Sequence, residues 1–407
     1  MESIKTDEEW LAIIEDNRGG FHRLPADMPL KRAVSLRRKA LERLCGVSLQ
    51  ASGNYTLDES KSHCENMFGA TQVPLGVAGP LFIQGEYCKE NPVYIPLATT
   101  EGALIASIAR GCRALNASGG VTVRVEDIGI TRAPVLKTRG IVHSQQVLSW
   151  VNANLDIIRE YCESGSRFLR LQEIMPYVVG CTVYLRFRFT CGDAMGMNMA
   201  TIACDRAIRQ LIEPATDAVC VSISGNMCAD KKSAAVNILH GRGKRIFAEA
   251  EISQQTLETV LKTTAESMHE VQYRKNMLGS AIAGSTGFNA HHANMLAAFY
   301  LACGQDIAQV AESAVGITCI EPREKGTIYA SIMLPDTPLA TVGGGTSLST
   351  QREVLALMGI TPGQKDPGYD SLRLAEILGG VVLAGELSVI AAQSVHHLAS
   401  AHQRLGR

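Results

Sequence analysis

Charged residues are scarce in this sequence, and neither sign dominates. Asp, Glu, Lys and Arg make up 19% of the 407 residues, and the formal net charge is -1, whereas about a quarter of an average globular chain is charged. Such a chain has no long-range field that would attract nucleic acid or an anionic membrane surface. The composition therefore argues against a nucleic-acid scaffold or a disordered hub, and indicates a large core and further surface hidden between subunits.

Long uninterrupted hydrophobic runs are missing as well. The most apolar stretch, residues 378–392, is interrupted by Glu386, whereas a membrane-spanning helix needs about 18 or more apolar residues in succession. The N-terminal segment MESIKTDEEW is acidic where a secretory signal needs basic residues followed by an apolar stretch. The sequence therefore predicts a soluble, cytoplasmic protein without a membrane partner.

Paired cysteines and metal-binding patterns are also lacking. The 12 cysteines include no Cys-x-x-Cys pair, and the closest two, Cys220 and Cys228, are eight positions apart. We therefore expect reduced, mostly buried thiols. His269-Glu270 is not followed by the second histidine of a zincin motif. We predict no metal site.

The middle of the chain carries the clearest architectural pattern. Candidate strands and helices alternate there: a strand at 134–143, a helix at 147–163, strands at 168–175 and 182–190, a helix at 195–213 and a strand at 218–224. This order, strand–helix–strand–strand–helix–strand, is the ferredoxin-like arrangement.

The rest of the chain is expected to be mostly helical. Residues 1–66 form a helical lead-in, and the Ala-rich stretches 289–309 and 378–405 predict long helices after residue 225. The basic amphipathic stretch 30–44 is interpreted as a solvated helix face. We thus predict an α+β protein in which residues 67–131 and 225–407 form a large, mostly helical domain. Residues 132–224 form a small ferredoxin-like domain inserted into it.

No recognised phosphate-binding signature is present. No G-x-G-x-x-G sequence lies between a strand and a helix, so a Rossmann domain is not supported. The segment DAMGMNM, residues 193–199, opens a predicted helix whose free N–H groups could hold a phosphate. Gly196 would let the ligand approach the backbone. The alternative is a simple turn followed by a helix with core methionines.

Three segments hold charged residues that could carry chemistry. Asp230-Lys231-Lys232 follows an apolar strand and could bind a carboxylate or stabilise an oxyanion, or could be a solvated loop. His291 and Asp306 are 15 positions apart on one predicted helix, within about 60° of each other. Thr99 or Thr100 is expected to cap a helix, which places Glu101 in its first turn.

Together these segments closely resemble the 3-hydroxy-3-methylglutaryl-coenzyme A (HMG-CoA) reductases. The resemblance covers most of the chain from Glu65 to His402 and rests on ten strings in the family's order. They are GVAGP (76–80), ATTEG (98–102), RGCRA (110–114), DAMGMNM (193–199), SGN and DKK (224–232), GRGK (241–244), NAHHAN (289–294), GQDIAQ (304–309), TVGGGT (341–346) and AGELS (384–388).

The resemblance implies an activity, an assembly and a catalytic set. The family reduces HMG-CoA to mevalonate and free coenzyme A by two hydride transfers, a four-electron reduction that feeds isoprenoid synthesis, in an active site at a dimer interface. Glu101 matches its proton-donating glutamate and Lys231 the lysine that stabilises the oxyanion. Asp306 matches the aspartate that links these two, and His402 the histidine that protonates the departing thiolate. A buried cluster of this kind would tune the glutamate as an acid and keep the lysine charged.

The resemblance also implies binding residues, and the cofactor expected from it is NADPH. The positions matching those that hold the hydroxymethylglutaryl group are Arg132, Ser224, Asp230, Lys232, Lys275 and Asn294. The positions matching the dinucleotide site are Ser166, Arg167, Phe168, Asp193, Met195, Gly196, Met197, Asn198, Gly343, Gly344 and Gly345. Arg167 could pair with the 2′-phosphate of NADPH in bidentate fashion.

Two departures from the family pattern and two alternative functions stay open. Ala109 stands where the family has an asparagine, and Ser233 stands where it usually has a proline, which would leave the Lys231 loop less rigid. An RNA-binding protein built on the ferredoxin-like unit is disfavoured by the neutral charge and by the missing base-stacking aromatic pair. The other alternative is an inactive or NADH-dependent reductase that works mainly in the oxidative direction.

Overall fold

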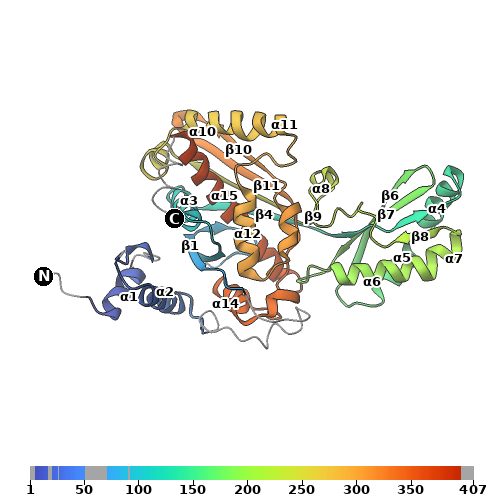
Figure 1. Ribbon diagram of the computed structural model, residues 1–407, viewed down its shortest axis with the longest axis horizontal. Coiled ribbons are helices and arrows are strands. Elements are labelled where there is room, and N and C mark those ends of the chain that lie inside the picture. The colour runs from blue at the N-terminus through green and yellow to red at the C-terminus, as the bar shows by residue number, and fades with distance from the viewer. Residues whose placement is uncertain (1–4, 17–20, 26, 51–70, 90–91, 396–407) are drawn as a thin grey trace.

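One sheet runs through the whole molecule and joins a large part to a smaller one (Figure 1). The computed structural model describes residues 5–16, 21–25, 27–50, 71–89 and 92–395. The strands follow one another across the sheet in the order β10 (Ile317–Pro322), β11 (Ile328–Thr337), β9 (Arg242–Ile252), β4 (Val121–Arg132), β7 (Thr182–Thr190), β5 (Val135–Lys137) and β8 (Val219–Ser222), with β6 (Arg170–Val179) paired to β7 and β2 (Ile83–Gln84) to β4.

Strand β4 belongs to both parts. Its first residues pair with β9, and Ile130 to Arg132 pair with β7. The register shifts at Gly129, which has a φ of +89° and lies so close to the carbonyl of Phe189 that a Cβ would meet that oxygen at 2.4 Å. A glycine is therefore needed where the strand passes from one part to the other.

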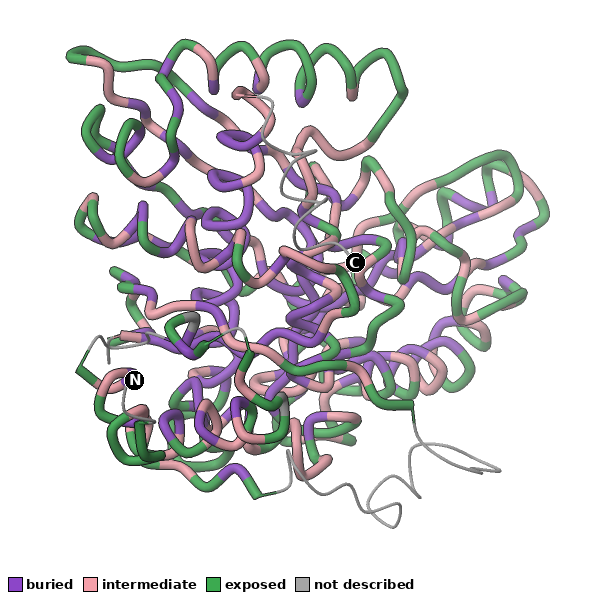
Figure 2. The backbone as a smooth tube through the Cα atoms, turned by 60° about the vertical axis from the view of Figure 1, so that its left-hand side comes forward, coloured by how far each residue is buried: buried purple, intermediate pink, exposed green. Residues whose placement is uncertain are grey.

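The large part is built around α15 (Tyr369–Ser394), which packs on β4, β9 and β11 and contacts α3 (Leu104–Ala117) and α12 (His292–Cys303). Glycines allow this close packing, since a Cβ on Gly111 of α3 would meet the carbonyl oxygen of Ala384 at 1.9 Å. By length and composition α15 could cross a membrane, but its most apolar window is 100% buried inside the protein. It is a core helix. Figure 2 shows the buried residues gathered in the interior of the molecule.

The smaller part has a hydrophobic core of its own. Its elements follow the order β5, α4 (Ile141–Ala153), α5 (Leu155–Glu163), β6, β7, α6 (Met197–Ala207) and β8, and α6 continues through η4 (Ile208–Ile212) and α7 (Glu213–Thr216). Its strands pair antiparallel in the order β6-β7-β5-β8. The strand predicted at 182–190 is confirmed, and Val183, Leu185, Phe187 and Phe189 on its inner face are all 0% exposed.

An N-terminal helical layer lies against the large part. Helices α1 (Asp7–Asp16) and α2 (Leu30–Cys45), with η1 (Phe21–Arg23) between them, share a small core with Tyr94 of β3 (Val93–Ala98) and Leu357 of α14 (Ser349–Leu357). Strand β3 pairs with β1 (Leu75–Leu81) in a separate two-stranded sheet. The short elements that remain are α8 (Ala235–His240), α9 (Gln254–Thr256), η5 (Leu257–Leu261), α10 (Ala265–Val271), η6 (Gln272–Gly279), α11 (Ser280–Ala283), η7 (Ile307–Gln309), α13 (Val310–Ser313), η8 (Glu324–Gly326) and η9 (Gly344–Ser347).

The prediction for the large part missed three strands and placed one helix end wrongly. Besides its helices, the C-terminal half contains β9, β11 and β10, which form an antiparallel sheet. Strand β9 alternates buried and exposed residues from Arg245 to Ile252, but alanine supplies half of the buried positions and hides the strand pattern. The helix predicted at 289–309 ends at Cys303, since Gly304 adopts a φ of +69° against the backbone of Gly345.

Candidate active site

Lys231 lies in the loop after β8 and forms an ion pair with Asp306. The distance from Lys231 Nζ to Asp306 Oδ2 is 2.8 Å. The other carboxylate oxygen of Asp306 accepts the N–H of Ala308 at 3.1 Å and so caps η7. The hydrogen bond that Lys231 donates to Asp306 raises the pKa of Lys231 above its ordinary value. The ammonium group therefore stays charged and is held in one place.

Beneath this pair, Asp230 is fixed by a fully buried arginine. Arg242 is 0% exposed and donates to Asp230 Oδ1 at 3.0 Å, and Gln309 donates to the same oxygen at 3.1 Å. Arg242 also bonds to Thr131 of β4 and to Glu312. We refer to Lys231, Asp306 and Asp230 as the Lys231 cluster.

Glu101 is held by a second group of polar side chains. Asn294, in the first turn of α12, donates from Nδ2 to Glu101 Oε1 at 3.3 Å, and the same nitrogen lies 3.3 Å from His291 Nδ1. Contrary to expectation, Glu101 precedes its helix, because Ala103 has a φ of +72° and α3 begins at Leu104. The N–H of Glu101 donates to Thr99 Oγ1 at 3.0 Å. We call Glu101, His291 and Asn294 the Glu101 cluster.

In the part of the chain that the structure describes, the two clusters are not connected to each other through their catalytic side chains. Among the described residues, no hydrogen bond or ion pair joins Glu101 to Lys231 or to Asp306. The prediction that His291 and Asp306 share one helix is wrong, since α12 ends before Asp306 is reached. His402 lies outside the described residues.

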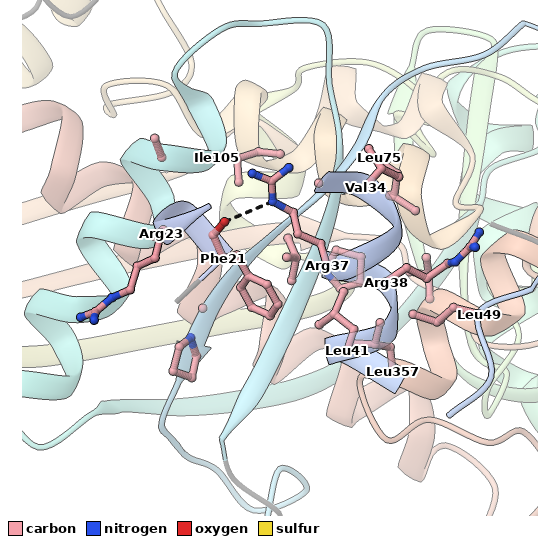
Figure 3. A pocket seen from close by; sticks show the side chains of 18 of the residues that line it. Phe21, Arg23, Val34, Arg37, Arg38, Leu41, Leu49, Leu75, Ile105 and Leu357 are labelled. Carbon is pink, nitrogen blue, oxygen red and sulfur yellow. Dashed lines mark hydrogen bonds between the residues drawn. The ribbon is translucent and has the colours of Figure 1, made fainter. Parts of the chain in front are cut away.

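Sequence reasoning missed a cavity of about 720 Å³ between α2, β1 and α3. Figure 3 shows its apolar lining, in which Phe21 and Leu41 lie among other hydrophobic side chains. Its lining includes four arginines, Arg23, Arg37, Arg38 and Arg113. Arg37 is half-buried and donates to the carbonyl of Phe21 at 3.2 Å, so the basic side of α2 is not simply a solvated helix face. The many arginines in residues 30–44 were the sequence feature that could have indicated this cavity.

Comparisons with known proteins identify the family. The profile described as hydroxymethylglutaryl-coenzyme A reductase matches residues 33–407. A 3-hydroxy-3-methylglutaryl-coenzyme A reductase of Methanothermobacter thermautotrophicus is 47% identical over 404 residues, covering 98% of this chain and 100% of that protein. The chain belongs to this family.

Other relatives agree with that assignment. A reductase of the same name from Haloferax volcanii is 45% identical and covers 95% of this chain and 96% of that protein. A solved class II 3-hydroxy-3-methylglutaryl-CoA reductase from Streptococcus pneumoniae, bound to NADPH, superposes with a TM-score of 0.71 at 17% identity, covering 92% of this chain and 98% of that one. The fold is therefore the mixed helix and sheet fold of these enzymes.

The substrate-binding residues expected from the family fall near both clusters. Ser224 and Lys232 lie on the same loop as Lys231, and Lys232 Nζ donates to the carbonyl of Asp230 at 3.1 Å. Arg132 ends β4, and its buried Nε has no hydrogen-bond partner among the described residues. Ser233 bonds through its hydroxyl to Thr286, so a hydrogen bond ties down the loop where the family usually has a proline. Lys275 lies in η6.

The residues expected to bind the dinucleotide gather around the start of α6. Gly196 has a φ of +91° and caps that helix, which begins at Met197 and leaves the side chain of Asn198 exposed. The loop with Gly343, Gly344 and Gly345 is tied to this region, because Thr341 N–H donates to the carbonyl of Asp193 at 2.9 Å. Arg167 is exposed and lies over the ring of Phe168 at 5.5 Å. Ser166 accepts two backbone N–H groups of the turn that follows it, and Met195 packs against the small core.

Asp193 has a role that the sequence did not suggest. Its two carboxylate oxygens accept the N–H groups of Gly368 and Ser371, each at 2.9 Å, at the start of α15. A carboxylate at a helix N-terminus is favoured by the free N–H groups and by the helix dipole. Asp193 therefore anchors the smaller part to the central helix of the large part.

Proposed function

We propose that this chain reduces HMG-CoA to mevalonate and free coenzyme A in the mevalonate pathway, with oxidation of two NADPH. Membership of the reductase family and the Lys231–Asp306 ion pair carry this proposal. NADPH, when bound, supplies a hydride to the thioester carbon and then to the aldehyde carbon. Each hydride places negative charge on the carbonyl oxygen, and two protons complete the alcohol and the thiol.

The Lys231 cluster stabilises that developing charge. A preorganised ammonium group aimed at an oxyanion lowers the barrier because it needs no reorganisation during the reaction. Asp306 keeps Lys231 protonated and oriented at 2.8 Å. Glu101 supplies a proton to the reacting oxygen, and His402 protonates the departing thiolate so that it does not recapture the aldehyde.

The proposed binding residues form two groups, one for the hydroxymethylglutaryl group and one for NADPH. Arg132, Ser224, Asp230, Lys232, Lys275 and Asn294 hold the hydroxymethylglutaryl group, and the α6 start with Gly343 to Gly345 and Arg167 holds NADPH. The open space around Gly343 and Gly344, where a Cβ would meet nothing within 4 Å, supports close approach of a ligand to that loop. The α6 N–H groups support phosphate binding.

The cavity between α2 and α3 suits the coenzyme A portion of the substrate. Its volume of about 720 Å³ lies within the range of small-molecule sites, and apolar walls with a few charged groups are typical of them. Arg23, Arg37, Arg38 and Arg113 offer guanidinium groups to the phosphates of coenzyme A. Ile105 and Ala106, one turn after Glu101, line the same cavity, which supports continuity with the Glu101 cluster.

We further infer that the complete site forms between two subunits of a homodimer or a higher homo-oligomer. Within the described residues of one chain no hydrogen bond or ion pair joins Glu101 to Lys231 or to Asp306, although the reaction needs all three, and this supports the inference. The low charge content also agrees with a large buried interface.

Residues 132–224 are proposed to form a ferredoxin-like dinucleotide domain inserted between 67–131 and 225–407. The antiparallel strand order β6-β7-β5-β8 and the separate core support that boundary. A cytoplasmic location is part of the same proposal and fits a buried α15, the one helix of the described residues that is long and apolar enough to cross a membrane.

The function is tested by measuring NADPH loss at 340 nm with purified chain and HMG-CoA. We expect about two NADPH oxidised per HMG-CoA and release of one free thiol, with lower rates from NADH. Lys231→Ala should lower kcat by about 10²–10³-fold, because one oxyanion-stabilising donor is lost. A folded sample without HMG-CoA-dependent NADPH loss, or a Lys231→Ala variant at near-normal rate, would contradict the proposal.

A control for the shared site uses two inactive variants together. Lys231→Ala and Glu101→Gln should each be inactive alone. If Lys231 acts with Glu101 of the partner subunit, mixed dimers formed by subunit exchange contain one intact site, and about a quarter of the normal activity should return. No recovery after verified exchange would place both residues of each site in one chain.

A further inference from the structure

The AGELS segment of α15 buries a carboxylate that the proposed mechanism does not use. Glu386 is 0% exposed. It accepts the backbone N–H of Ala290 and of His291, both at 2.8 Å, and the hydroxyl of Thr318 at 2.6 Å. The two backbone donors fix the chain immediately before α12, where His291 is the N-cap residue and Asn294 lies in the first turn.

Glu386 is an anion in the folded protein. Burial alone would raise its pKa, but the neighbouring His292 and His291, the hydroxyl of Thr318 and the N–H of Ala290 outweigh burial and lower the pKa below its ordinary value. A buried carboxylate with this many donors is strongly localised, because each hydrogen bond to a charged acceptor is stronger than one to a neutral acceptor. It can therefore hold a loop in one geometry.

From this carboxylate a first path leads to Glu101. His291 Nε2 lies 3.1 Å from the carbonyl of Gly385, and a carbonyl only accepts, so the ring carries its proton on Nε2. Its Nδ1 then accepts one hydrogen of Asn294, which leaves the second hydrogen of that amide for Glu101 Oε1. The position of His291 thus decides which way the amide of Asn294 faces.

A second path leads to Lys275. The backbone carbonyl of Thr318 accepts a hydrogen bond from Gln272, whose side-chain oxygen accepts from Asn276 at 2.7 Å. Lys275 Nζ donates to Asn276 Oδ1 at 2.9 Å. These residues lie in the π-helical turn η6, a distortion that often accompanies functional sites. Glu386 and Thr318 are therefore the common origin of both paths.

We infer that Glu386, with Thr318, is a positioning residue that orients Glu101 through His291 and Asn294 and supports Lys275 through η6. The inference rests on the proposed function, since it assigns Glu386 no contact with substrate. Gly385 is part of the arrangement, because a Cβ there would meet the sulfur of Met295 at 2.5 Å and would push α12 away from α15.

The chain contains a matched control on the same helix. Glu376 is also 0% exposed and lies ten positions earlier on α15. It accepts the backbone N–H groups of Glu86, Tyr87 and Cys88 at 2.7, 3.0 and 2.6 Å. It clamps a loop in the same manner as Glu386, but that loop, between β2 and β3, carries no member of either cluster.

The test compares Glu386→Gln with Glu376→Gln in the full-length enzyme. In each variant one carboxylate oxygen becomes an NH₂ group that faces a backbone donor. Glu386→Gln should lower kcat by about 10–100-fold through misplacement of the acid, with KM for NADPH within about twofold of normal. Glu376→Gln should leave kcat within about twofold of wild type, although its Tm should fall about as much as the Tm of Glu386→Gln. In an Asn294→Ala background, Glu386→Gln should add less than about threefold, because the path to Glu101 is already cut and only the path to Lys275 remains.

Equal kcat in the two glutamine variants, or fully additive losses in the Asn294→Ala background, would overturn the inference. If Glu386→Gln does not fold, Thr318→Val is tested in the same cycle, because it removes one donor from Glu386 and keeps the side-chain shape. A wild-type chain without reductase activity would contradict the proposed function instead, so the two failures are distinguishable.

Discussion

The two halves of the candidate site rest on buried charged residues that are stabilised in opposite ways. The Lys231 cluster rests on Arg242 and Arg186, both 0% exposed, which face Asp230, Glu312 and Asp336. The Glu101 cluster rests on one carboxylate, Glu386, which accepts three hydrogen bonds and has His291 and His292 beside it. In the first group anions outnumber cations, and burial raises the pKa of both Glu312 and Asp336. In the second group several hydrogen-bond donors surround one anion, Glu386, and its pKa is lowered.

This difference indicates how each half tolerates change. A group with surplus carboxylates can take up a proton and stay neutral overall, and it then depends on its cations. A group with a single, fully bonded anion depends on that anion. We therefore expect the most damaging substitution to replace an arginine beneath the Lys231 cluster and a glutamate beneath the Glu101 cluster.

The largest effect on stability is expected from Arg242→Met. The change leaves Asp230 without its buried cation and removes the bonds to Glu312 and Thr131. Losing one partner of a buried ion pair costs about 3–5 kcal/mol, which denaturant unfolding would measure. The double variant Arg242→Met/Glu312→Met should recover part of that loss, since no carboxyl group remains at position 312. A single variant within about 1 kcal/mol of wild type would show that Arg242 does not support this half.

Sequence patterns anticipated the individual residues better than their arrangement. The inner face of β7 follows from strict alternation, and the loop with Lys231 follows from an apolar strand and a sudden run of charge. The end of α12 at Cys303 was not predicted, because the reason is the backbone of Gly345, some forty positions later. Arg242 appeared only as part of a family string, and Glu386 only in a family string and as the charge that interrupts the most apolar stretch, so neither was assigned a role in the core. Such contacts are set by tertiary packing, which periodicity does not encode.

The next effect in size concerns acid stability on the Glu386 side. His292 is fully buried and donates to Thr318 from Nε2, and its Nδ1 has no partner among the described residues. Burial lowers the pKa of His292 from 6.5 to about 4. Between pH 6.5 and pH 4 the unfolded chain therefore binds a proton at His292 that the folded chain does not bind. The free energy of unfolding falls by about 3 kcal/mol in total over this range.

The measurement is the free energy of unfolding of wild type and of His292→Gln at pH 7 and at pH 4. The difference between the two proteins should shrink by about 3 kcal/mol at the lower pH, because glutamine has no proton to take up. Glu386 stays ionised above its own lowered pKa and should not contribute in the upper part of this range. A constant difference would mean that folding does not lower the pKa of His292, and a difference that grows at pH 4 would mean that His292 is a charged partner of Glu386.

The smallest expected effect compares the two halves most directly, because the same change, glutamate to glutamine, is made in each half. Burial raises the pKa of Glu312, although the neighbouring Arg242 opposes that shift, and this direction favours a neutral acid with nearly the shape of glutamine. Glu312→Gln should therefore change stability by less than about 1 kcal/mol and kcat by less than about twofold, whereas Glu386→Gln removes a charge that is in use. Unfolding and steady-state kinetics of the two variants, side by side, measure the contrast. A loss for Glu312→Gln as large as that for Glu386→Gln would show that Glu312 is ionised beside Arg242, and that both halves depend on a buried anion.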